Sequence, residues 1–71
     1  MKYEIFSHKA EIEGEVYDTL GIVAKDQQNT YVFEDITTFD SELEKFVSFL
    51  NEENVSLKCF KIFLELFMES L

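Results

Sequence analysis

The fold of this chain is decided by residues 57–71, which read LKCFKIFLELFMESL. Wound as a helix at about 100° per residue, this stretch places its four charged side chains on one stripe about 80° wide: Lys58, Lys61, Glu65 and Glu69. Apolar side chains cover roughly 240° of the remaining circumference, whereas a surface helix of a small domain needs an apolar stripe of only about 100°. The pattern predicts a helix that buries one side within its own domain and another side elsewhere, which indicates association.

The second apolar side of this helix is the predicted contact surface. If its phenylalanines face the rest of the domain, three smaller side chains project from another side: Cys59, Ile62 and Leu66. Burying a large aliphatic side chain contributes about 1.5–3 kcal/mol, so two or three of them matter to a small domain. The alternative is that the domain wraps enough of its own surface around the helix to hide them.

A shorter amphipathic helix is predicted over residues 41–52. Apolar residues recur there with the i, i+3, i+4, i+7 spacing of a buried helix face: Leu43, Phe46, Val47 and Leu50. Phe49 falls off this stripe and is expected to reach the helix over 57–71, which adds it to the predicted contact surface.

Both helices carry a recognisable start. Ser41 followed three residues later by Glu44 matches a capping box, with the chain entering at Phe39 or Asp40. Ser56 is expected to cap the helix over 57–71 with its side-chain oxygen.

Three strands are predicted before the helices, over residues 2–12, 16–25 and 30–36. Gly14 supplies the first turn, because glycine tolerates the positive φ that tight hairpins need. Alternation in the third strand places Tyr31 and Phe33 opposite Val32 and Ile36. The predicted fold is α+β, with one domain over residues 1–71. It consists of a three-stranded antiparallel meander followed by two helices packed on one face of the sheet.

Composition excludes several classes of partner. Six lysines, no arginine and 15 acidic residues give a formal net charge of −9. Such a chain is expected to be repelled by nucleic acid and by anionic membranes, since their binders present basic surfaces. No apolar run approaches the roughly 18 residues of a membrane span, and no signal-peptide pattern follows Met1, so a cytoplasmic location is expected.

The acidic residues between 34 and 44 form the densest charged cluster: Glu34, Asp35, Asp40, Glu42 and Glu44. Their spacing partly imitates a calcium loop, but Lys45 stands where the required glycine would be, and Asn51 replaces the bidentate glutamate. Carboxylates at a helix start are favoured by the macrodipole, which is the better account of Glu42 and Glu44. No metal site is predicted here.

Cys59 and His8 are the only residues that suggest nucleophilic catalysis. A Cys–His pair must meet in space, with a third group orienting the histidine, and a zinc site needs more ligands than these two. Cys59 lies on the apolar arc of its helix, where a free cysteine commonly packs as a small hydrophobe. The sequence therefore predicts no catalytic residue and no cofactor. A single cysteine also excludes an internal disulfide, which leaves association as the reinforcement of a small core.

Residues 17–71 resemble a family of small bacterial proteins of unknown function from spore-forming Gram-positive species. The similarity lies in Leu20-Gly21-Ile22, in Phe33-Glu34-Asp35-Ile36-Thr37 and around residues 51–57. The family typically has proline and histidine after the serine of that last segment, where this chain has Leu57 followed by Lys58-Cys59. The resemblance implies a bacterial cytosolic setting and no particular activity.

The sequence leaves two hypotheses about function. The leading hypothesis is a non-enzymatic interaction domain that self-associates or docks on a protein partner through Cys59, Ile62, Leu66 and Phe49. The second is an acidic inhibitor that covers the nucleic-acid groove of a basic protein, as a phage anti-defence or anti-CRISPR protein would. It requires carboxylates concentrated on one face.

Overall fold

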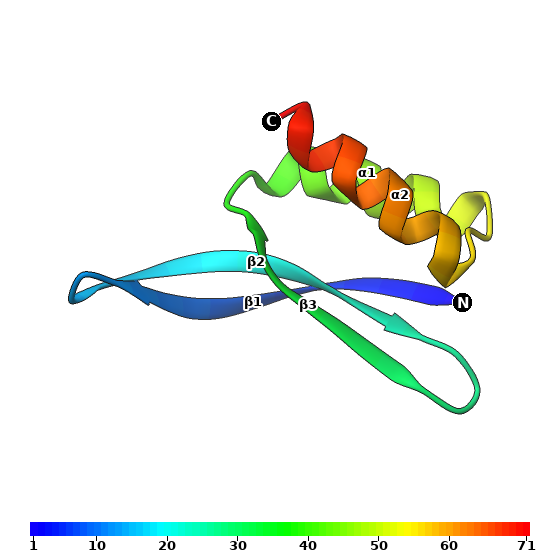
Figure 1. Cartoon of the computed structure of the whole chain (residues 1–71), viewed down its shortest axis with the longest axis horizontal. Coiled ribbons are helices and arrows are strands. Elements are labelled where there is room, and N and C mark those ends of the chain that lie inside the picture. The colour runs from blue at the N-terminus through cyan, green and yellow to red at the C-terminus, as the bar shows by residue number, and fades with distance from the viewer.

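A computed structural model of the whole chain, residues 1–71, shows a three-stranded antiparallel sheet followed by two helices (Figure 1). The strand order is β1-β2-β3, and both helices lie over the same face of the sheet. The elements are β1 (Lys2–Ile12), β2 (Glu15–Lys25), β3 (Thr30–Thr37), α1 (Asp40–Glu52) and α2 (Leu57–Glu69). The predicted α+β fold is confirmed.

The β1–β2 hairpin is longer than the rest of the sheet. These two strands pair along their full length, from Lys2 with Lys25 to Ile12 with Glu15. Strand β3 pairs only with the half of β2 from Leu20 onward, so residues 9–18 project beyond β3 and the helices as a two-stranded arm (Figure 1). We call these residues the hairpin arm. Ile12 lies near its tip and is 56% exposed.

The arm ends in a turn with positive φ at two successive residues, Glu13 (φ 52°) and Gly14 (φ 83°). Positive φ at both central positions is the pattern of type I′ turns, whose twist matches that of the flanking strands. The predicted role of Gly14 is therefore confirmed, and Glu13 shares the left-handed conformation.

Strand β3 contains a bulge that changes which residues face the core. The pairing register moves from Ile22 with Phe33 to Leu20 with Thr37, so more residues lie on β3 than on β2 between the two pairs. Asp35 sits in this bulge with φ 53°. Ile36 is consequently buried in the core, whereas Val32 is exposed. The prediction that Ile36 shares a face with Val32 is wrong, because the bulge breaks the two-residue period.

Gly21 lies on β2 opposite the bulge. A Cβ at this position would clash with the backbone carbonyl oxygen of Phe33 and with the ring of Phe6 on β1. Glycine is therefore required here for a close approach between neighbouring strands rather than for an unusual φ.

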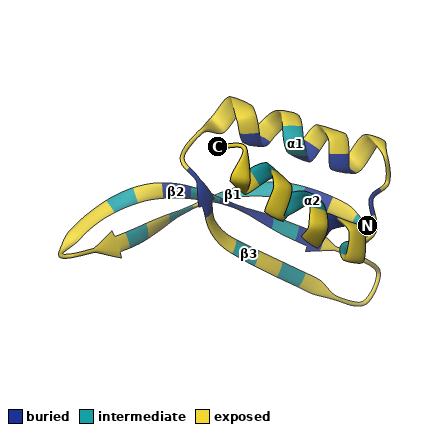
Figure 2. Ribbon diagram, turned by 45° about the horizontal axis from the view of Figure 1, so that its top comes forward, coloured by how far each residue is buried: buried dark blue, intermediate teal, exposed yellow.

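The core lies between the sheet and the two helices, where the buried residues of Figure 2 gather. Helix α1 contributes three buried residues, Leu43, Val47 and Leu50. Helix α2 contributes a single fully buried residue, Phe60. The remaining buried apolar residues come from the strands and the loop between the helices: Tyr3, Ile22, Ala24, Ile36 and Val55.

The ring of Phe60 is the fully buried contact between α2 and the rest of the domain. Its centroid lies 5.0 Å from that of Tyr3 on β1 and 4.9 Å from that of Phe33 on β3. The ring of Phe46 on α1 stacks 6.3 Å away. Aromatic pairs at these separations add about 0.5–1.5 kcal/mol beyond their buried area. One side chain therefore connects α2 to two strands and to α1.

The two helix starts differ. Ser56 caps α2 as predicted, since its side-chain oxygen accepts a hydrogen bond from the backbone N–H of Cys59 at 3.4 Å. The predicted capping box at Ser41 is wrong, because α1 already begins at Asp40. Phe39 occupies its N-cap position without a side-chain cap hydrogen bond. The N–H of Phe39 instead donates to the hydroxyl of Thr37 at 3.1 Å, and the helix begins two residues earlier than the capping box predicts.

Candidate functional site

The outer face of α2 carries large apolar side chains that the domain does not cover. Ile62 is 57% exposed and Leu66 is 56% exposed, and Cys59 is exposed beside them. These three residues follow the i, i+3, i+7 spacing of one helix face, directed away from Phe60 and the sheet. We call Cys59, Ile62 and Leu66 the outer face of α2.

Cys59 belongs to this surface and not to the core. Its expected packing as a buried hydrophobe is wrong, because Phe60, one position later, takes the direction toward the sheet. The Ser56 cap fixes the first turn of the helix in this orientation.

Helix α1 borders one flank of the outer face. Phe49 of α1 packs edge-on against Phe63 of α2, with ring centroids 5.4 Å apart. Phe46 stacks on Phe67, 4.5 Å away and nearly parallel. Phe49 nevertheless stays 38% exposed, so it extends the apolar surface from α2 onto α1. All four side chains of the predicted contact surface are therefore exposed on the helical layer, and Phe49 reaches α2 through its contact with Phe63.

A shallow groove borders the opposite flank, between α2 and β3. It has a volume of about 480 Å³, and its apolar wall consists of Phe33, Leu64 and Met68. Charged residues of α2 stand at its rim: Lys61, Glu65 and Glu69. The sequence pattern does not predict this groove. The i, i+4 spacing of Leu64 and Met68 was visible, but their position against Phe33 depends on where α2 lies on the sheet.

The charges on α2 are arranged against its own macrodipole. Its first turn contains no acidic residue and its last turn no basic one, whereas α1 carries Asp40 and Glu42 in its first turn. Lys58 lies at the positive end of α2 and Glu69 at the negative end, which is the unfavourable order. The three ion pairs of the chain are all in the sheet, so none involves α2: Lys2–Glu4, Lys9–Asp18 and Lys25–Glu4.

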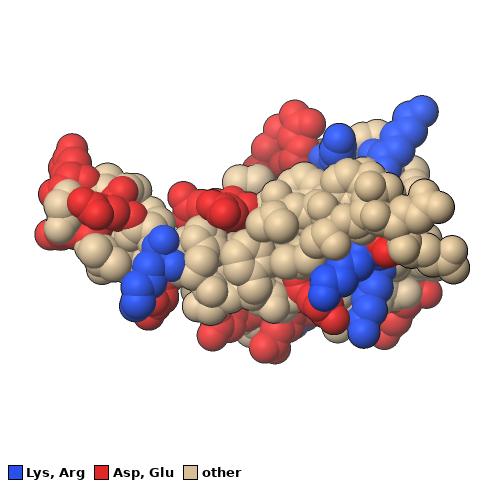
Figure 3. All heavy atoms as spheres, turned by 90° about the horizontal axis from the view of Figure 1, so that it is seen from below, with Lys and Arg blue, Asp and Glu red and all other residues tan.

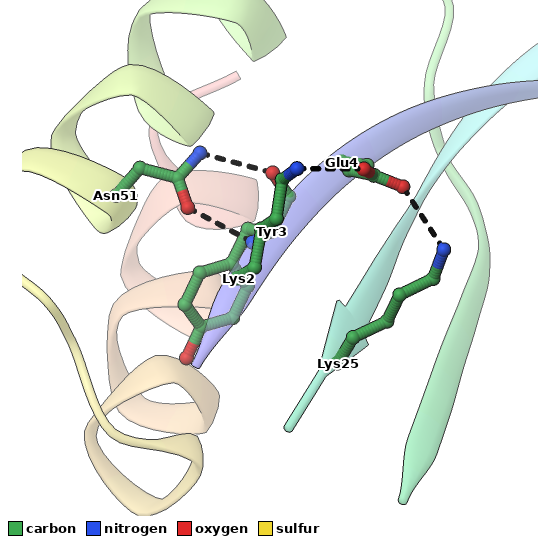
Figure 4. Close-up of polar contacts among 5 residues, drawn as sticks. All are labelled: Lys2, Tyr3, Glu4, Lys25 and Asn51. Carbon is green, nitrogen blue, oxygen red and sulfur yellow. Dashed lines mark hydrogen bonds and ion pairs between the residues drawn. The ribbon is translucent and has the colours of Figure 1, made fainter. Parts of the chain in front are cut away.

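A side-chain amide holds α1 against the open edge of β1 (Figure 4). The Oδ1 of Asn51 accepts from the N–H of Tyr3, and the Nδ2 of Asn51 donates to the carbonyl of Tyr3, both at 2.9 Å. Asn51 therefore takes the place of a neighbouring strand at this residue. An edge strand covered in this way cannot pair with another chain at that point.

Tyr3 also anchors the loop between the helices. Its phenol donates a hydrogen bond to the carbonyl of Val55 at 2.7 Å. Burial raises the pKa of this phenol above its usual value, because the phenolate would be poorly solvated, and the nearby Cys59 thiol raises the pKa further. Tyr3 is thus a neutral donor that fixes the start of α2.

Next to Tyr3, the exposed carboxylate of Glu4 lies 3.2 Å from the amine of Lys25 and 3.5 Å from that of Lys2 (Figure 4). The hydrogen bond and charge of Lys25, followed by those of Lys2, lower the pKa of Glu4. These ion pairs are exposed to solvent, where such contacts contribute little to stability.

His8 has a structural role at the bulge. Its Nε2 accepts a hydrogen bond from the N–H of Asp35 at 2.8 Å, and its ring stacks on Phe6. The carboxylate of Asp35 in turn accepts from the hydroxyl of Thr19 at 2.9 Å. By strand alternation, His8 shares the face of Phe6, opposite to that of Tyr3. The structure therefore does not bring His8 and Cys59 together. No three side chains of the kinds that bind metals converge anywhere in the chain.

The acidic residues of the cluster from 34 to 44 occupy different parts of the fold. Asp35 lies in the bulge, and Asp40 and Glu42 lie in the first turn of α1. All members of the cluster are exposed: Glu34, Asp35, Asp40, Glu42 and Glu44. On the face shown in Figure 3, carboxylates lie at the tip of the hairpin arm, over the middle of the molecule and along its margins. That face presents no single acidic patch.

Comparison with known proteins gives no neighbour from which a function could be carried over. No family model, no curated protein and no solved structure matches this chain. Neither helix combines the length and the apolar character needed to cross a membrane.

Proposed function

We propose that this chain is a protein-interaction domain without enzymatic chemistry, which docks through the outer face of α2 and the adjoining Phe49. One observation carries the proposal. The most apolar helix of the molecule has a single fully buried residue, while its Ile62 and Leu66 stay more than half exposed.

The free energy to be gained by covering Ile62 and Leu66 supports docking. Complete burial of an aliphatic side chain contributes about 1.5–3 kcal/mol, and roughly half of that remains to be gained at Ile62 and Leu66. Covering both would therefore contribute roughly 1.5–3 kcal/mol. A chain of this length buries only about 60% of its unfolded surface, so a contribution of this size is substantial.

The composition of the surface favours a protein partner. Protein interfaces combine an apolar centre with a polar rim, and the outer face of α2 has this organisation. Lys58 and Glu69 border the apolar residues on one side, and Ser48 and Glu52 of α1 lie near Phe49 on the other. The net charge of −9 opposes binding to nucleic acid or to an anionic membrane.

Site-specific photo-crosslinking tests this proposal. A photoreactive phenylalanine analogue would replace Leu66 on α2 or, as a matched control, Ile12 on the hairpin arm, since both side chains are 56% exposed. Irradiation would be done with the purified chain and in an extract of its native host. We expect discrete protein adducts from position 66 that are absent from position 12. Unlabelled wild-type chain should compete for them, whereas an Ile62→Glu variant should not. Identical patterns from the two positions, or none from position 66, would contradict the proposal.

A further inference from the structure

Resting on this proposed function, we infer that the occupant of the outer face of α2 is a second copy of the chain, with the two α2 helices packed antiparallel across a two-fold axis. The exposure of Ile62 and Leu66 alone does not identify the occupant. The order of charges along α2 identifies the occupant.

Opposite charges stand at the two ends of α2. Lys58 and Lys61 lie in its N-terminal half, and Glu65 and Glu69 lie in its C-terminal half. An antiparallel copy places Lys58 beside Glu69 of the partner subunit, and the two-fold axis repeats this contact. A parallel copy would instead place the charged stripes of the two helices on opposite sides of the contact, where the lysines and glutamates do not meet. The surface is therefore complementary to itself in one orientation only.

The macrodipole gives a second reason for the same orientation. Helix α2 has lysine at its positive end and glutamate at its negative end, and no ion pair within the chain compensates for this. In an antiparallel pair, Glu69 of the partner subunit lies beside the positive end and Lys58 of the partner subunit beside the negative end. Each end then receives the charge that the dipole favours. The unfavourable charge order of the isolated helix becomes favourable in the dimer.

The apolar residues fit the same arrangement. Cys59, Ile62 and Leu66 follow the spacing of a helix–helix seam. With the two-fold axis near residue 64, Ile62 packs against Leu66 of the partner subunit, and Leu66 against Ile62 of the partner subunit. Each subunit then covers the two large aliphatic residues of the other.

The contact area determines how tightly two copies are expected to associate. Helix α2 has 13 residues, so one face of it measures about 20 Å by 10 Å, or about 200 Å². Phe49 enlarges the contact, but it stays well below the roughly 800 Å² per partner of a standard interface. The dimer is therefore a weak, rapidly exchanging one, and measurements must extend to millimolar concentration.

Sedimentation equilibrium of the full chain tests self-association, at an ionic strength of about 0.15 M to screen the repulsion between two acidic subunits. Ile62→Glu is compared with Ile12→Glu, because the two isoleucines are 57% and 56% exposed and the two variants carry the same net charge. We expect wild type and Ile12→Glu to dimerise with rising concentration. Ile62→Glu should raise the dissociation constant at least about tenfold, with an unchanged circular dichroism spectrum. Equal weakening by both variants would overturn the inference.

A charge exchange tests the orientation. The variant K58E/K61E/E65K/E69K keeps the net charge of the chain and places acidic residues at the start of α2, where the macrodipole favours them. If the pairing is antiparallel, the exchanged variant forms homodimers. A mixture of the variant with wild type should then contain fewer heterodimers than random exchange of subunits predicts. Native mass spectrometry would measure the two populations. Predominant heterodimers, or an exchanged chain that stays monomeric, would overturn the antiparallel arrangement.

The two proposals fail in different ways. A purified wild-type chain that stays monomeric at millimolar concentration would overturn the second copy as partner. If position 66 still formed discrete adducts in the extract, docking through α2 would stand with another protein as its occupant. If neither occurred, both proposals would fall.

Discussion

Helices α1 and α2 have the same length and lie over the same sheet, yet they bury their apolar residues very differently. Helix α1 is amphipathic, and its three aliphatic residues, Leu43, Val47 and Leu50, are all buried. Helix α2 is richer in apolar residues, but only Phe60 is fully buried. Burial in this domain therefore follows the position of a helix over the sheet and not its apolar content. The excess on α2 is left for a surface outside the domain.

The means of attachment also differ. Helix α1 is joined to β1 both by its buried stripe and by the two hydrogen bonds between Asn51 and Tyr3. Helix α2 has one fully buried side chain, Phe60, and its other inner contacts come from partly buried residues: Leu57, Phe63, Leu64 and Phe67. The following four substitutions test this contrast, in order of decreasing expected effect.

Phe60→Ala should have the largest effect. Truncating a buried phenylalanine costs about 3–5 kcal/mol, and a domain of this length has a total stability of about 4–11 kcal/mol. Urea unfolding followed by circular dichroism would measure the loss. Phe49→Ala serves as the control, because Phe49 is partly exposed and should cost much less. Equal losses in the two variants would show that α2 is attached through its whole inner surface and not through one ring.

Asn51→Ala should have the next largest effect. It removes two hydrogen bonds to the backbone of Tyr3, each worth about 0.5–1.5 kcal/mol, so the expected loss is about 1–3 kcal/mol. It also uncovers the edge of β1, which should increase aggregation on heating. Glu52→Ala, one residue later on the exposed side of α1, is the control for both measurements. A stability equal to that of wild type would show that the amide contributes nothing to the attachment of α1.

Tyr3→Phe should cost about 1 kcal/mol, because it removes the hydrogen bond to the carbonyl of Val55 while keeping the ring. The loss should depend on pH. The folded pKa of Tyr3 is raised, so the folded state holds the phenolic proton more tightly than the unfolded state. This contribution is fully present below the ordinary tyrosine pKa of about 10, and it is lost as the pH rises through the higher folded pKa.

The measurement is the difference in unfolding free energy between wild type and Tyr3→Phe across the alkaline range. This difference should shrink as the pH rises, since lysine titration is common to both chains. A constant difference would mean that the phenol is not shielded from water.

Ile62→Ser should have the smallest effect on the fold. Substitutions on an exposed surface usually change stability by less than about 0.5 kcal/mol, and Ile62 is more than half exposed. The test is thermal unfolding at micromolar concentration, with Leu43→Ser on α1 as the contrasting variant. A large loss from Ile62→Ser in a dilute monomer would mean that the outer face of α2 belongs to the core after all.

Much of the architecture followed from local patterns in the sequence. Periods of two and of 3.6 residues predicted the strands and the helices, and Gly14 and Ser56 act at the turn and the helix start as expected. These predictions held because each depends on residues within one or two turns of chain. Three others were wrong because a contact that the periodic pattern does not reveal overrode it. Ile36 turns into the core at the bulge, Thr37 moves the start of α1 away from Ser41, and Phe60 displaces Cys59 to the surface.

The same distinction between local sequence pattern and tertiary contacts applies to the candidate site. The sequence by itself determined that α2 carries apolar side chains around most of its circumference and that its charges run from basic to acidic, because helical geometry fixes both. Only the tertiary structure decided which apolar side chains stay uncovered. The sheet and its contacts bury the inner stripe of α1 but bury only one side chain of α2 completely, the ring of Phe60. The sides of α2 that carry Ile62 and Leu66 therefore lie beyond the reach of the chain's own residues.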